Sequence, residues 1–110
     1  MSKTDFDPAL TPPTLTIEGD LSFGTAADIR TALLEAFEEA RDRLRIDVSD
    51  VETIDLAGVQ LLYAARRTAD ARGIDLEVEY GKNAKRFEKL YGFAGLKPLD
   101  AEAGSTHAGT

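Results

Sequence analysis

Apolar and polar side chains alternate in three stretches of the chain, at residues 15–23, 44–48 and 74–80. This period of two is the pattern of a β-strand that buries one of its faces. Gly19 interrupts the first stretch and predicts a bulge or bend there. The strict alternation of the last stretch indicates that one face of the resulting sheet stays in contact with water.

Between these stretches the apolar positions recur every three or four residues, which predicts amphipathic helices over residues 25–40 and 56–72. Thr25 is expected to cap the first helix, and Gly73 is expected to end the second in a left-handed conformation. A third, shorter helix is predicted over residues 83–92, with its first residue as the cap. Three apolar side chains after it are expected to pack back on the body of the protein: Phe93, Leu96 and Leu99.

The order strand, helix, strand, helix, strand, helix requires crossover connections, and right-handed crossovers place neighbouring strands parallel. We therefore expect an α/β fold: one domain over residues 14–99, with a mostly parallel sheet of four or five strands and helices mainly on one side. Residues 1–13 are expected to be a flexible lead-in, because their three prolines withhold backbone donors. Residues 100–110 are poor in large apolar side chains and are expected to form a disordered tail.

Composition and charge exclude several classes of function. The 110 residues carry 13 Lys and Arg against 20 Asp and Glu, a net charge of −7, whereas nucleic acids and anionic membranes require a basic face. The absence of cysteine removes disulfides, thiolate metal sites and Cys nucleophiles, and the single histidine, His107, lies in the expected tail. We therefore expect no metal site and no cofactor. No signal peptide or membrane-spanning run is recognisable, so a cytoplasmic protein is expected.

Asp55 marks the change from strand to helix at the start of the second predicted helix. Its carboxylate can accept hydrogen bonds from the free N–H groups of the first helical turn and complements the positive end of the helix. Gly58 is unusual inside a helix, where glycine costs about 1 kcal/mol relative to alanine. It either packs against a neighbouring segment or allows the backbone of a partner to approach closely.

The stretch DVSDVETIDLAGVQLLYAARRTADARGIDLEV resembles the STAS domain family of bacterial anti-sigma factor antagonists and their relatives. Family members carry an apolar strand that ends in Asp, then Asp-Ser-Ser-Gly or Asp-Thr-Ala-Gly, a Leu-rich helix, a glycine and an alternating strand. The upstream IEGDLSFGTAADIRTAL and the downstream KRFEKLYGFAGL also resemble the family, so the likeness covers residues 14–99. It implies a STAS fold and regulation by partner switching, through binding to another protein.

The chain departs from the family at the position that carries phosphate in phosphorylated members. There, the second hydroxyl residue after the motif Asp accepts phosphate from a kinase that is also the anti-sigma factor. Here that position is Ala57 and the first hydroxyl position is Leu56, and neither side chain has an acceptor oxygen. The resemblance therefore implies a variant that is not phosphorylated at the usual site. Ser49 and Thr53 lie nearby and are expected to be ordinary turn or strand residues.

The resemblance also implies a partner-binding surface at the start of the second helix. It consists of six consecutive residues: Asp55, Leu56, Ala57, Gly58, Val59 and Gln60. Asp55 would orient the helix, Gly58 would permit close approach and the other four would form or border the contact. From the residues alone, Leu56 is either an exposed apolar handle for the partner or a core residue.

Three kinds of partner fit this resemblance. The first is an anti-sigma factor or a related kinase-like protein. The pair Ala57-Gly58 also resembles two other branches of the family. One is the small STAS subunit that docks on the ATPase of bacterial phospholipid ABC transporters, in which threonine precedes this pair, and the other comprises STAS proteins encoded with chemotaxis components.

An enzyme or phospho-receiver is the main alternative from a different class. Asp47, Asp50 and Asp55 could form an acidic pocket for Mg²⁺, but Asp47 alternates with apolar neighbours and Asp50 falls in a predicted turn. No glycine-rich phosphate loop follows any predicted strand, so no catalytic residue and no enzymatic activity are expected. A carrier of small molecules or lipids is a third alternative, although a chain of this size leaves little room for a cavity beyond its core.

Overall fold

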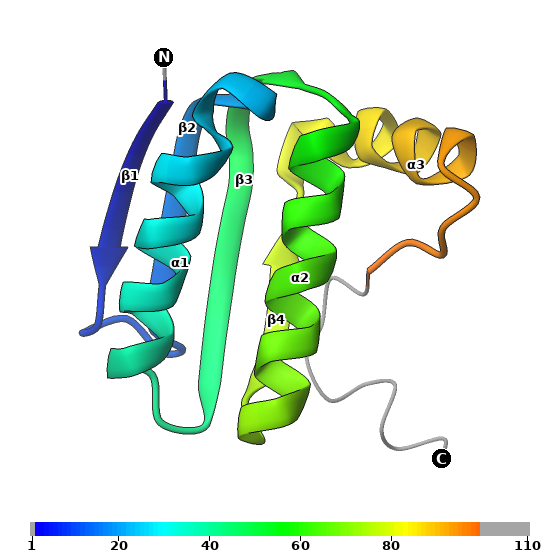
Figure 1. Cartoon of the computed structure of the whole chain (residues 1–110). Coiled ribbons are helices and arrows are strands. Elements are labelled where there is room, and N and C mark those ends of the chain that lie inside the picture. Colours follow the sequence, from blue (N-terminus) through cyan, green and yellow to red (C-terminus); the bar gives the residue numbers. More distant parts are fainter. Residues whose placement is uncertain (1, 100–110) are drawn as a thin grey trace.

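The computed structural model describes residues 2–99, which are built around one four-stranded sheet. The strands are β1 (Ser2–Asp7), β2 (Thr14–Leu21), β3 (Arg43–Ile54) and β4 (Asp75–Glu79). They lie in the order β1-β2-β3-β4 across the sheet (Figure 1). β1 runs antiparallel to β2, whereas the pairs β2–β3 and β3–β4 are parallel.

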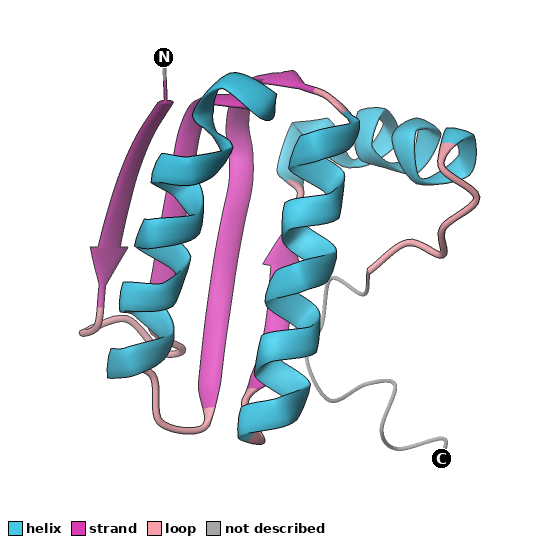
Figure 2. Cartoon of the chain, viewed as in Figure 1, coloured by secondary structure: helices cyan, strands magenta, loops and turns pink. Residues whose placement is uncertain are grey.

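Three α-helices connect and cover the strands (Figure 2): α1 (Ala26–Glu39), α2 (Leu56–Arg72) and α3 (Ala84–Phe93). Two short 3₁₀-helices, η1 (Phe23–Thr25) and η2 (Gly81–Asn83), precede α1 and α3. Helices α1 and α2 lie side by side over the same face of the sheet, and α3 lies beside the N-terminal half of α2 (Figure 1). The predicted α/β fold, with a mostly parallel sheet and helices mainly on one side, is confirmed.

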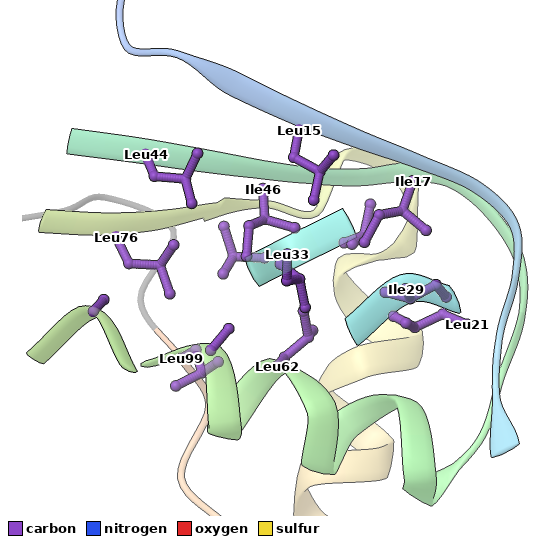
Figure 3. Close-up of a cluster of buried hydrophobic side chains, with 14 of the residues drawn as sticks. Leu15, Ile17, Leu21, Ile29, Leu33, Leu44, Ile46, Leu62, Leu76 and Leu99 are labelled. Atoms are coloured by element: carbon purple, nitrogen blue, oxygen red, sulfur yellow. The ribbon is translucent and has the colours of Figure 1, made fainter. Parts of the chain in front are cut away.

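One hydrophobic core lies between the sheet and the helices (Figure 3). Alternate strand residues point into it, as the period-two pattern predicts: Leu15, Ile17, Leu44, Ile46, Leu76 and Val78. The helices contribute buried residues at helical spacing: Ile29, Leu33 and Phe37 from α1, and Val59, Leu62 and Ala65 from α2. The two periodicities of the sequence therefore identify both sides of the core.

The opposite face of the sheet carries polar and charged side chains. Thr16, Asp47 and Glu79 stand in one row across β2, β3 and β4. In the next row the side chains of Arg45 and Glu77 form an ion pair across β3 and β4. All five alternate with core residues along their strands, so they point away from α1 and α2.

The N-terminal segment differs from its sequence-based prediction. Regular structure was expected to begin after Pro13, but Ser2–Asp7 forms the antiparallel edge strand β1. Phe6 pairs with Leu15 of β2, and its half-buried side chain packs against the core. All three prolines lie in the connection between the two strands, where they remove no donor from the sheet. The expected tail, residues 100–110, lies outside the described residues.

The segment that follows α3 agrees with its prediction only in part. Leu99 is buried and Leu96 is partly buried against the core, as expected. Phe93 is instead 88% exposed. The buried face of α3 carries Phe87 and Tyr91, and the helical period turns Phe93 away from that face.

Candidate partner-binding surface

Both ends of α2 have the local geometry that the sequence predicts. Asp55 precedes the helix with an extended backbone (φ −131°, ψ −177°), and its Oδ1 atom accepts a hydrogen bond from the Gly58 N–H at 3.0 Å. This bond satisfies one of the free donors in the first helical turn. At the other end, Gly73 adopts the predicted left-handed conformation with φ 69°.

The second carboxylate oxygen of Asp55 joins α2 to a segment 32 residues earlier in the chain. Its Oδ2 atom accepts a hydrogen bond from the Phe23 N–H at 3.0 Å. The Asp55 N–H donates in turn to the Leu21 carbonyl oxygen at 3.3 Å. Asp55 therefore holds the end of β2, the start of η1 and the start of α2 together at one edge of the sheet.

Gly58 is buried where the first turn of α2 crosses the end of β2. A Cβ atom at this position would lie 2.2 Å from the carbonyl oxygen of Leu21 and 2.8 Å from its Cγ atom. These separations are too short for any van der Waals contact, so no side chain fits without a shift of the backbone. Of the two roles open to Gly58, the structure shows the intramolecular one: β2 makes the close approach.

The remaining residues at the start of α2 differ in exposure. Leu56 is 47% exposed, so it is not a core residue, and Gln60 is also exposed. Ala57 is half-buried. Val59 is fully buried, so its implied place at the border of a contact is corrected: the helical period turns it into the core.

Phe23 lies next to these residues, and the sequence pattern placed it wrongly. The alternation that includes Leu21 predicts a strand side chain at position 23, but the chain leaves the strand at Ser22 and enters η1. The Phe23 side chain is consequently 83% exposed, beside Asp55, to which its N–H is bonded. We name the group formed by the exposed Phe23, Leu56 and Gln60 and the half-buried Ala57 the α2 N-terminal surface.

A local signal for this turn is present in the sequence. The Thr25 hydroxyl oxygen accepts a hydrogen bond from the Ser22 N–H at 3.2 Å and donates to the Asp20 carbonyl oxygen at 2.8 Å. Thr25 does precede α1, but its side chain makes no capping hydrogen bond to that helix. The spacing Ser22-x-x-Thr25 therefore marks the start of η1 rather than a cap on α1.

The three aspartates considered for a Mg²⁺ pocket do not converge. The Oδ1 atom of Asp47 accepts hydrogen bonds from the N–H and hydroxyl groups of Ser49, at 2.9 and 2.6 Å. Asp50 lies 3.8 Å from the Lys82 ammonium, and Asp55 is engaged at the start of α2. Within the described part of the chain, no group of three or more His, Cys, Asp or Glu side chains is placed to hold a metal ion.

Almost the whole described chain matches one family model. The model is described as "Mlab, STAS domain" and matches residues 5–98. The chain belongs to the STAS domain family. No curated protein matches the sequence. Across the described residues of this STAS protein, every helix is too short or too polar to cross a membrane.

Solved structures of anti-sigma factor antagonists share the fold. One from Mycobacterium paratuberculosis is 20% identical over 93% of this chain and 87% of its own, with a TM-score of 0.68. A STAS domain antagonist from Rhodobacter sphaeroides is 24% identical over 76% of this chain and 91% of its own, with a TM-score of 0.65. The antagonist SpoIIAA in its unphosphorylated form is 20% identical over 96% of this chain and 92% of its own, with a TM-score of 0.64. At these identities the likeness establishes the fold.

Proposed function

We propose that this STAS protein is a non-catalytic regulator that binds another protein through the α2 N-terminal surface. The observation that carries the proposal is the exposure of Phe23 (83%) and Leu56 (47%) on either side of the Asp55 junction. Large apolar side chains grouped at one point of an otherwise charged surface are typical of contact sites for other proteins. Binding would remove both from water, which is a favourable contribution to association.

The partner that fits best is an anti-sigma factor or a related kinase-like protein in the cytoplasm. The solved structures that share the fold are named as anti-sigma factor antagonists, which supports this choice. In this proposal no phosphate at the usual position controls the interaction, since Leu56 and Ala57 both lack a hydroxyl group. Affinity then depends on the apolar contact itself.

Docking on the ATPase of a phospholipid ABC transporter is the second candidate. The pair Ala57-Gly58 favours it, because that branch of the family carries the same two residues, although Leu56 stands where the branch has threonine. A chemotaxis component fits the same pair. Identification of the bound protein separates the three partners.

The experiment places a photo-reactive benzoylphenylalanine at Phe23 and, as a control, at the exposed Arg41, which precedes β3 and so lies at the opposite end of that strand from Asp55. We expect one protein of the host cell to crosslink at position 23 and not at position 41. The purified partner is then titrated by calorimetry with the wild type, Leu56→Ser and Leu34→Ser. Leu34 is a matched control, since it is 44% exposed but lies on α1.

Leu56→Ser should weaken binding by about tenfold or more, because it removes the burial of one leucine side chain from the contact. Leu34→Ser should bind like the wild type. Equal affinity of the wild type and Leu56→Ser would contradict the proposed function.

A further inference from the structure

A groove between α2 and the segment after α3 continues the α2 N-terminal surface. Its volume is about 440 Å³. Six residues line it: Leu56, Gln60, Tyr63 and Arg67 from α2, and Ala94 and Leu96 from the following segment. Leu56 and Gln60 belong to both features, so a partner seated on the surface would also reach the groove.

Arg67 is the arginine of α2 that has no partner within the described residues. Arg66 forms an ion pair with Asp70 at 3.4 Å, and Arg72 forms one with Glu38 at 3.3 Å. Arg67 is exposed and makes neither an ion pair nor a side-chain hydrogen bond in residues 2–99. A guanidinium group in this state is suited to a carboxylate, which it can bind through two parallel hydrogen bonds.

The segment that supplies Ala94 and Leu96 to the groove is cationic, although the whole protein is acidic. Residues 81–99 contain five Lys or Arg and one Glu, against a net charge of −7 for the chain. Lys97, next to the groove residue Leu96, is exposed, as is Lys89 on α3. A positive local potential on an acidic protein favours the approach of an acidic partner segment and disfavours a basic one.

Tyr63 supplies a further unsatisfied group beside the groove. Its hydroxyl is buried and has no hydrogen-bond partner among the described residues, while its ring packs edge-on against Tyr91 with a centroid distance of 5.7 Å. Burial raises the pKa of Tyr63, so the hydroxyl keeps its proton and lacks an acceptor. Most buried polar groups are paired, so this hydroxyl remains a donor for an acceptor atom of a ligand that reaches it.

We propose that the groove binds an acidic and apolar segment of the partner protein. A carboxylate of that segment pairs with Arg67, and a neighbouring large apolar side chain packs between Leu56 and Leu96. That the ligand belongs to a protein rests on the proposed function. The preference of the groove for an apolar carboxylate does not depend on the proposed function and can be measured without the partner.

The first test is a titration of the full chain with 3-phenylpropanoate, an apolar carboxylate of side-chain size, followed by amide chemical shifts in NMR. The shifts should concentrate at Gln60, Arg67 and Ala94, and 3-phenylpropylamine should not produce them. Arg67→Gln should weaken the binding by about fivefold, the usual effect of removing one exposed charge-assisted contact. Arg41→Gln is the matched control, because it removes an exposed arginine outside the groove.

Equal shifts from the amine, or unchanged affinity in Arg67→Gln, would overturn the groove proposal. The second test uses the partner identified by crosslinking and compares Arg67→Glu with Phe23→Ser. If Phe23→Ser weakens binding and Arg67→Glu does not, the groove proposal is wrong and the proposed function stands. If Arg67→Glu weakens binding by about tenfold and Phe23→Ser has no effect, the groove is supported and Phe23 lies outside the contact.

Discussion

Asp55 and Asn83 each join segments that are 32 residues apart, but their surroundings differ. Asp55 accepts N–H groups from η1 and α2 at the surface. Asn83 is 2% exposed, and its amide nitrogen donates to the carbonyl oxygens of Val48 and Val51 at 2.9 and 2.8 Å. The sequence predicts Asn83 as the cap of α3, but its side chain makes no capping bond and is instead bonded to the backbone of β3.

The comparison distinguishes a region whose side chains are all explained by folding from a region that keeps exposed apolar side chains. Around Asn83 the packing is complete: Arg86 donates to its amide oxygen at 2.8 Å, and Phe87 is fully buried nearby on α3. Around Asp55 the polar groups are equally well satisfied, yet Phe23 and Leu56 stay exposed. Folding alone explains the first region, whereas the exposed apolar groups of the second region contribute nothing to the core and are available to another molecule.

The largest effect on stability is expected from Gly58→Ala. Its Cβ would meet the Leu21 carbonyl oxygen at 2.2 Å, so β2 or α2 must shift. We expect a loss of about 3 kcal/mol in the free energy of unfolding, measured by urea denaturation. Gly92→Ala in α3 is the control, since no atom lies within 4 Å of its added Cβ, and it should be neutral or slightly stabilising. Equal losses of unfolding free energy in the two variants would show that Leu21 does not restrict the side chain at position 58.

Asn83→Ala should cost about 2–3 kcal/mol, because it leaves buried carbonyl groups of β3 without a donor. The same urea experiment measures it. Affinity for the partner should stay near that of the wild type once the measurement is made where the variant is folded. A loss below about 0.5 kcal/mol would place Asn83 with ordinary surface residues and remove the contrast with Asp55.

The α3 region should also lose stability at alkaline pH. Burial raises the pKa of Tyr91 from 10.0 to about 12, against the effect of its hydrogen bond with the Tyr80 hydroxyl. The folded protein therefore holds this proton at pH values where the unfolded chain releases it. The stabilisation is complete below pH 10 and is lost as the pH rises towards 12, by about 2 kcal/mol in total. The free energy of unfolding, measured by urea denaturation at pH 9 and at pH 11.5, should fall less between the two pH values for Tyr91→Phe than for the wild type.

Asp55→Ala should cost about 1 kcal/mol, the usual effect of losing a helix cap, and should weaken partner binding as well, because η1 and α2 lose their common acceptor. Asp55→Asn keeps one acceptor oxygen and should fall between Ala and the wild type in both measurements. If Asp55→Ala lowers stability without any change in affinity, the junction has no part in shaping the contact.

The smallest effect on stability is expected from Ala57→Asp, with a change below about 0.5 kcal/mol and a cooperative unfolding transition. Its affinity for the partner should nevertheless fall by about tenfold, since a charge would be placed in an apolar contact. Ala71→Asp, at an exposed position near the other end of α2, controls for the added charge. Undiminished affinity of Ala57→Asp in calorimetry would count against this surface.

Features that depend on local geometry were predictable from the sequence. The stripe Ile29, Leu33 and Phe37 identifies the buried face of α1 because one helical period relates the three residues. β1 was not predictable in this way. Its six residues include one large apolar side chain, Phe6, and the strand exists through its pairing with β2, which no local pattern encodes.

Within the candidate surface, too, some residues follow from local sequence signals and others depend on the folded structure. Asp55 and Gly58 were identified because a carboxylate before a helix and a glycine within it are local anomalies. Phe23 was not, because its exposure depends on the chain leaving the strand at Ser22. Val59 was included through its position in a run of consecutive residues, although neighbours in a helix point in different directions.

The half-buried methyl group of Ala57 has a consequence for how such proteins can diversify. Alanine and serine codons differ by a single nucleotide, and Ala57→Ser would add one oxygen atom while the Asp55 junction and the packing of Gly58 stayed in place. An inert methyl group and a hydroxyl that a covalent modification could use are thus one nucleotide substitution apart on the same backbone. A lineage could gain or lose such control without refolding the domain.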